Sequence, residues 1–138
     1  MGSRITIGVN DLAKTMGRIM GEITERSENA EIAARHAVAN EAAEKLREAS
    51  PVGTGKRAGQ YAKGWTVKEN KKSESIIWNA TDYRLTHLLE WGHQVVVHGN
   101  ATEKFTSPQS HIKEVEQWVK EEYPTRFEEE LINQYMGI

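Results

Sequence analysis

Cysteine is absent from this chain of 138 residues, and proline and phenylalanine are scarce, with three and two residues. Without cysteine there is no disulfide framework, no cysteine-ligated zinc site and no cysteine nucleophile. No apolar run approaches the roughly 20 residues that a helix needs to span a bilayer. The formal net charge is only −2, so the chain as a whole is not a binder of polyanions. The length of 138 residues suits a single domain over residues 1–138.

A long helix is predicted over residues 11–49, where no proline occurs. Apolar residues recur three or four positions apart at Leu12, Met16, Ile19, Ile23, Ala30, Ala34, Ala37, Val38 and Leu46. Thirty-nine residues of helix span about 58 Å, whereas a compact domain of this size is less than about 40 Å across. We therefore expect either a break near Gly17 or Gly21, or an overhang that packs on a neighbouring subunit.

Strands are predicted at three places. Gly64–Lys68 and Ser75–Asn79 are rich in β-favouring residues and read as a hairpin, and Ile5–Val9 alternates apolar and polar residues. Gln94–His98 is β-branched, and it either adds to a partner's sheet or completes the sheet of its own domain. The polar segment Gly99–Ser110 is expected to be a loop, as is Gly53–Gln60.

Two further helices follow from apolar spacing. Leu85, Leu88 and Leu89 lie on one face of a short helix that stops at Gly92, where a left-handed residue is expected. Residues 112–138 carry a second apolar face, with Ser110 as the expected cap; Pro124 either kinks one helix or starts another. The predicted fold class is α+β, with the long N-terminal helix and the C-terminal helix packed on a small antiparallel sheet.

Charge is distributed unevenly along the chain. The window 56–72 holds six basic residues against Glu69, a net charge of +5, whereas residues 112–138 carry −4. The basic window is either a footprint for DNA or for an acidic neighbour, or a solvated edge whose lysines discourage strand pairing.

Catalytic and metal sites are not predicted. His87, Glu90 and His93 follow each other at intervals of three, but the zinc-protease pattern His-Glu-x-x-His is absent. We expect His87 to satisfy a buried hydrogen bond, Glu90 to bind an amide or Arg84, and His93 to lie beside the helix C-terminus. A metallohydrolase site at the three residues remains the less favoured alternative. The four tryptophans are expected to be core or interface anchors.

Three segments resemble one family. Arg84–His93 reads Arg-Leu-Thr-His-Leu-Leu-Glu-Trp-Gly-His, Ser50–Gly55 reads Ser-Pro-Val-Gly-Thr-Gly, and Ser110–Ile112 reads Ser-His-Ile. Their order and spacing resemble the head–tail joining, tail-completion or tail-component proteins of tailed bacteriophages. The chain departs from that family over residues 94–108, where the family usually has a glycine-rich, basic loop.

The resemblance implies a structural virion protein and not an enzyme. It would assemble as a homo-oligomeric ring at the head–tail (neck) junction or the tail end, beside other neck, connector or tail proteins, and would be found in the virion after assembly in the host bacterial cytoplasm. Passing DNA is a candidate for non-specific contact, and no cofactor, metal or membrane is expected. A DNA-binding module using residues 56–72 is the alternative function. The candidate interaction residues are Trp91, His93, Val95, Val96, Val97, Lys56, Arg57 and Lys63.

Overall fold

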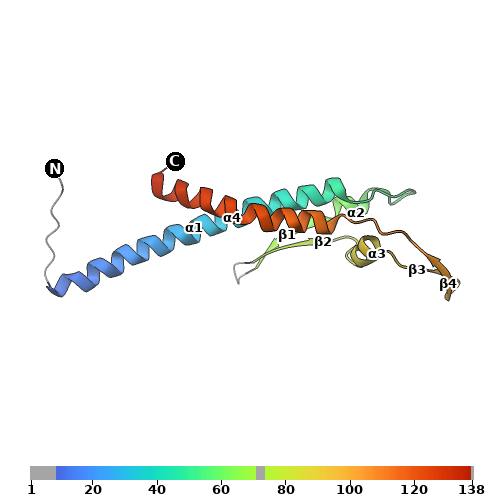
Figure 1. Cartoon of the computed structure of the whole chain (residues 1–138), viewed down its shortest axis with the longest axis horizontal. Coiled ribbons are helices and arrows are strands. Elements are labelled where there is room, and N and C mark those ends of the chain that lie inside the picture. The colour runs from blue at the N-terminus through green and yellow to red at the C-terminus, as the bar shows by residue number, and fades with distance from the viewer. Residues whose placement is uncertain (1–8, 71–73, 138) are drawn as a thin grey trace.

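One helix sets the length of the molecule. The structure, a computed structural model, describes residues 9–70 and 74–137. Helix α1 runs unbroken from Val9 to Ala49, and its N-terminal half projects well beyond the other elements (Figure 1). The alternative of a break near Gly17 or Gly21 is therefore wrong. At 1.5 Å per residue, α1 is about 60 Å long.

The C-terminal half of α1 forms the core with helix α4, Ile112–Met136, which runs antiparallel along it (Figure 1). The buried face of α1 consists mainly of small residues, at Ala30, Ala34, Val38, Ala39, Ala42, Ala43 and Leu46. Small side chains allow the two helices to approach closely. Pro124 lies inside α4, which continues through it as one helix.

A hairpin packs against the same half of α1. Strands β1, Trp65–Glu69, and β2, Ser75–Asn79, pair antiparallel, with Trp65 opposite Asn79 and Glu69 opposite Ser75. The buried Trp65 donates its Nε1 hydrogen to Ser50 Oγ at 2.7 Å. The predicted hairpin and the α+β class are confirmed.

Helix α2, Gln60–Lys63, was not predicted. It is a single turn that lies within the basic window, and its Tyr61 and Ala62 are buried. Tyr61 joins Ala42, Leu46, Trp65 and Val115 in the main apolar cluster.

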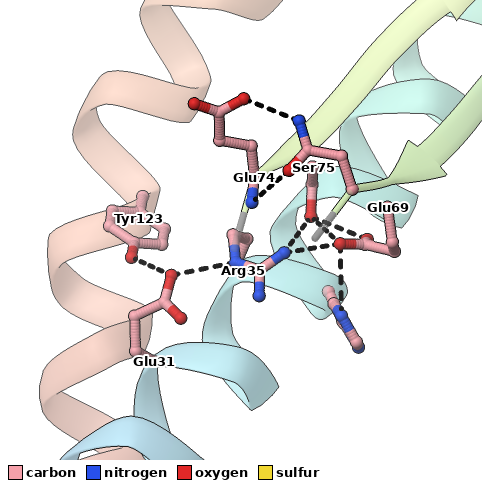
Figure 2. Close-up of polar contacts among 8 residues, drawn as sticks. Glu31, Arg35, Glu69, Glu74, Ser75 and Tyr123 are labelled. Carbon is pink, nitrogen blue, oxygen red and sulfur yellow. Dashed lines mark hydrogen bonds and ion pairs between the residues drawn. The ribbon is translucent and has the colours of Figure 1, made fainter. Parts of the chain in front are cut away.

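A polar cluster ties α1, the hairpin and α4 together where the covered half of α1 begins (Figure 2). Arg35 of α1 donates to Glu31 Oε1 at 2.9 Å and to Ser75 Oγ at 2.8 Å, and it pairs with Glu69. Tyr123 of α4 donates to the same Glu31 oxygen at 3.0 Å. Because this cluster connects α1 to both the hairpin and α4, the projecting N-terminal half of α1 extends from a segment that two other parts of the fold hold in place.

Helix α3, Leu85–Trp91, confirms the predicted short helix and leads into a second, separate hairpin. This hairpin, here called the arm, consists of β3, Gln94–Val97, and β4, Asn100–Phe105, and lies at the end of the molecule away from the overhang (Figure 1). Gly92 ends α3 with φ +77° and ψ 169°, which is not the left-handed helical cap that was predicted. A Cβ at Gly92 would lie 2.4 Å from the Thr106 carbonyl oxygen, so the close approach of the arm also requires glycine.

Two predictions for strands and loops need correction. Residues 100–105 of the expected loop Gly99–Ser110 form β4, because His98 and Gly99 both have positive φ and make a tight turn that returns the chain along β3. Of the predicted strand Ile5–Val9, Val9 belongs to α1 and the rest lies outside the described residues.

Candidate assembly surfaces

The joint between α3 and α4 is made by one carboxylate. Glu90, on α3 and only 6% exposed, accepts backbone N–H groups of His111 at 2.7 Å, Ile112 at 3.0 Å and Lys113 at 3.0 Å. Ser110 Oγ donates at 3.0 Å to Glu90 Oε1, the oxygen that also accepts the Lys113 N–H. Glu90 therefore satisfies the orphan N–H groups that begin α4, and its charge opposes the positive end of the helix dipole.

These hydrogen bonds control the ionisation of Glu90. Burial disfavours the charged form and would raise the pKa, but the three backbone amides and the Ser110 hydroxyl favour the carboxylate more strongly. The pKa of Glu90 falls from 4.5 to about 2 as a result. Glu90 is thus a structural anion at neutral pH.

His111 connects the joint between α3 and α4 to the buried core. Its side chain is fully buried, and its Nδ1 donates to the Gln109 carbonyl oxygen at 2.7 Å and lies 3.2 Å from Glu90 Oε2. With that tautomer, Nε2 accepts the Tyr61 hydroxyl hydrogen at 2.6 Å. Burial, with the nearby charges of Glu90 and Asp82, raises the pKa of Tyr61 above its ordinary value. The segments containing Glu90 and His111, 21 residues apart in the chain, form one buried unit.

The expectations for this segment had mixed outcomes. Glu90 does bind amides, as predicted. Ser110 is not the cap of α4, whose N-cap is His111 without a side-chain cap bond. His87 is exposed and not the buried hydrogen-bonding residue that was expected, because α3 turns Leu89 and Glu90 toward the core and His87 away from it.

The metal hypothesis gains no support from the geometry. The Glu90 oxygens are occupied by backbone and Ser110 donors. His93 Nδ1 lies 3.0 Å from Thr106 Oγ1. Within residues 9–70 and 74–137, no group of three His, Asp or Glu side chains is placed to hold a metal ion.

The arm and the end of α3 that precedes it present the first exposed apolar surface. Trp91 and Phe105 are 69% and 70% exposed, Val96 and Val97 are exposed and Val95 is half-buried. β3 pairs with β4 within the chain, with an irregularity between Gln94 and Val96, and not with the main hairpin. Packing between the arm and the helices is sparse. An isolated two-stranded hairpin is marginally stable in water, so a covered state suits the arm better.

Phe105 was missed among the candidate interaction residues. It is the only large apolar side chain in Gly99–Ser110, and that isolation within a polar segment was the available signal. The neighbouring candidate His93 is exposed, and Thr106 Oγ1 accepts its backbone N–H at 2.9 Å.

The overhang of α1, residues 9–29, carries the second exposed apolar surface. Met16, Ile19, Met20 and Ile23 are 45% to 64% exposed. Their spacing of i, i+3, i+4 and i+7 places them along one face of the helix. This set of four residues is here called the stripe.

The basic side chains of the window 56–72 are exposed where the structure describes them. Lys56, Arg57 and Lys63 are exposed, and Arg57 Nη2 pairs with Asp82 Oδ1 at 2.7 Å. Lys71 and Lys72 lie outside the described residues, so the +5 window is only partly placed.

No helix among the described residues has the length and apolarity to cross a bilayer.

Comparisons with protein-family models, with curated proteins and with solved structures found no match to this chain.

Proposed function

We propose that this chain is a structural subunit of a tailed-bacteriophage virion that assembles as a ring at the head–tail junction or the tail end. The proposal rests on the three segments that resemble that family and on the shape of α1. Its mechanism is association between subunits and with neighbouring neck, connector or tail proteins, without a catalytic step.

The observation that carries the proposal is the exposed stripe on the projecting half of α1. Its four residues, Met16, Ile19, Met20 and Ile23, have no covering element in the part of the chain that the structure describes. Leaving such side chains in water forfeits about 1.5–3 kcal/mol for each one that could be fully buried. A rod with an uncovered apolar face suits a subunit better than a solitary globule.

The arm, together with Trp91 at the end of α3, supports the same function from the opposite end of the molecule. Trp91, Val96, Val97 and Phe105 expose apolar area next to strand edges that further strands can pair with. Glu90 and His111 hold the start of the arm on α4. Subunits with an interaction surface at each end form rings or open filaments when the contacts are heterologous, that is, when one surface binds the other surface of the next subunit.

Electron microscopy and light scattering of the full chain test the proposal. We expect rings of uniform diameter, alone or after mixing with neck and tail proteins of the same phage, and antibody labelling at the neck or tail end of its virions. Virions that carry none of this chain would overturn the proposal, whatever the behaviour of the isolated protein.

DNA binding is the second candidate, favoured by the exposure of Lys56, Arg57 and Lys63 on neighbouring segments. Replacing Lys56 and Lys63 with Glu is expected to weaken retention on DNA and to flatten its dependence on salt, because fewer counterions are released. Lys120→Glu is the matched control, since Lys120 is exposed but pairs with Glu116 on α4. Equal retention of all the proteins on DNA argues against this candidate.

A further inference from the structure

The stripe continues an interface that already exists within the chain. From Ala30 onward, the corresponding face of α1 is buried under α4. Near its end, α4 lies beside Arg26, whose guanidinium carbon is 5.4 Å from the centre of the Tyr135 ring. N-terminal to that contact the same face carries the stripe, and no element covers it among the described residues. A second helix in line with α4 would complete the coverage.

We propose that the stripe is covered by the stripe of a second copy of this chain, with the two α1 helices antiparallel. Each partner helix then takes the orientation that α4 already has on α1, and its stripe continues the coverage beyond the end of α4. The inference deepens the proposed function, because it names the partner of the overhang.

Apolar spacing favours a self-complementary register. In an antiparallel pair, Met16 lies level with Ile23 of the second copy, and Ile19 lies level with Met20. All four positions of one stripe therefore meet apolar side chains of the other. Long, unbranched methionine side chains adapt well to such a contact.

Charge favours the antiparallel direction. The first part of the overhang carries Lys14 and Arg18 with Asp11, a net charge of +1, and the following part carries Glu22, Glu25 and Glu28 with Arg26, a net charge of −2. Antiparallel pairing places the basic part of each helix beside the acidic part of the other. Parallel pairing would place Lys14 beside Lys14 and Glu25 beside Glu25, which disfavours that direction.

The pairing is isologous, so it joins copies two at a time and closes on itself. It adds a link between subunits that is separate from any ring contact made by the arm. Rings whose subunits leave the stripe uncovered would therefore refute this inference and leave the proposed function standing.

Single cysteines test the register, since the natural chain has none. We expect Met16→Cys mixed with Ile23→Cys to give a disulfide-linked pair under mild oxidation. Met16→Cys alone should not link, because its two sulfur-bearing residues would be about 10 Å apart along the helix axis, beyond the roughly 7 Å limit between Cα atoms. Efficient linkage of Met16→Cys with itself would show parallel pairing and overturn the inference.

The control cysteine is Ile32→Cys. Ile32 is 41% exposed on the same helix, yet it follows Ile23 by nine residues, about two and a half turns, and so faces the opposite side. A mixture containing Ile32→Cys should link no faster than random collision. Equal linkage of the Met16→Cys with Ile23→Cys mixture and of this control contradicts the inference.

Sedimentation equilibrium of uncrosslinked protein gives a second reading. Ile19→Lys is expected to raise the dissociation constant of the pair at least about a hundredfold, because it buries a charge against an apolar stripe. Ile32→Lys should leave the dissociation constant within about twofold of the natural chain. A natural chain that stays monomeric at every concentration, or that pairs equally well with Ile19→Lys, refutes the inference.

Discussion

Replacing Glu90 with Gln tests the joint that positions the arm. The substitution keeps the size of the side chain but turns one carboxylate oxygen into an amide NH₂ group. Each oxygen now accepts two hydrogen bonds, one from Ser110 and Lys113 and the other from His111 and Ile112. Gln therefore loses two acceptor positions, and its NH₂ group faces two groups that are themselves hydrogen-bond donors.

The expected cost follows from the charge and burial of this contact. Hydrogen bonds to a charged group contribute about 1.5–3 kcal/mol each, so the loss of two costs at least about 3 kcal/mol. The lowered pKa of Glu90 is of the same order, because a fall from 4.5 to about 2 corresponds to about 3 kcal/mol of stability. For a chain of this size, 3 kcal/mol lowers Tm by roughly 10 °C.

The pH dependence has a definite sign. Since the pKa of Glu90 is lower in the folded state than in the unfolded state, its stabilisation is fully present above pH 4.5 and is lost as the pH falls towards 2. The natural chain should therefore lose more stability than Glu90→Gln between pH 5 and 2.

Chemical denaturation followed by circular dichroism measures both effects, and amide exchange at His111, Ile112 and Lys113 reports the local one. Glu116→Gln is the control, because Glu116 makes only an exposed pair with Lys120 and should cost less than about 0.5 kcal/mol. A Glu90→Gln protein as stable as this control, with unchanged amide exchange at the start of α4, would refute the reasoning.

Three further substitutions probe the fold. Gly92→Ala should destabilise the chain by about 1–3 kcal/mol in urea unfolding, because alanine is strained at φ +77° and its Cβ meets the Thr106 carbonyl oxygen. Asn79→Ala should cost about 2 kcal/mol in the same assay, since buried Asn79 donates to Tyr61 O and accepts the Asp82 N–H. Arg35→Met should lower Tm and speed amide exchange in β1 and β2, because it removes the Arg35 ion pair to Glu69 and the hydrogen bond to Ser75; unchanged exchange there would contradict this role.

Regular elements with local periodicity were predicted correctly from the sequence. The apolar residues of α1 and Leu85–Leu89 repeat at helical spacing, and the β-branched and aromatic residues around Trp65 and Trp78 favour strands. Strand β4 was missed because Asn100–Phe105 has no apolar alternation; its pairing depends on the positive φ angles at the turn. Local sequence patterns carry little information about such long-range or backbone-determined features.

The assembly surfaces could be predicted only in part. The stripe follows from helical spacing once α1 is known to be continuous, and Trp91 and Val95–Val97 were chosen from their composition. The role of Glu90 at the start of α4 could not be derived, because no local pattern relates a carboxylate on one helix to amides 21 residues later. His87 was misjudged for the same reason, since its exposure depends on how α3 sits against α4.

Amide hydrogen exchange of the full chain at increasing protein concentration tests most directly whether the overhang is covered by another copy. Exchange over residues 14–29 should slow as the concentration rises, while the already covered residues 30–49 keep the same protection, and Ile19→Lys should abolish the change. Exchange over residues 14–29 that is equally fast at every concentration, in the natural chain and in Ile19→Lys alike, would contradict the account.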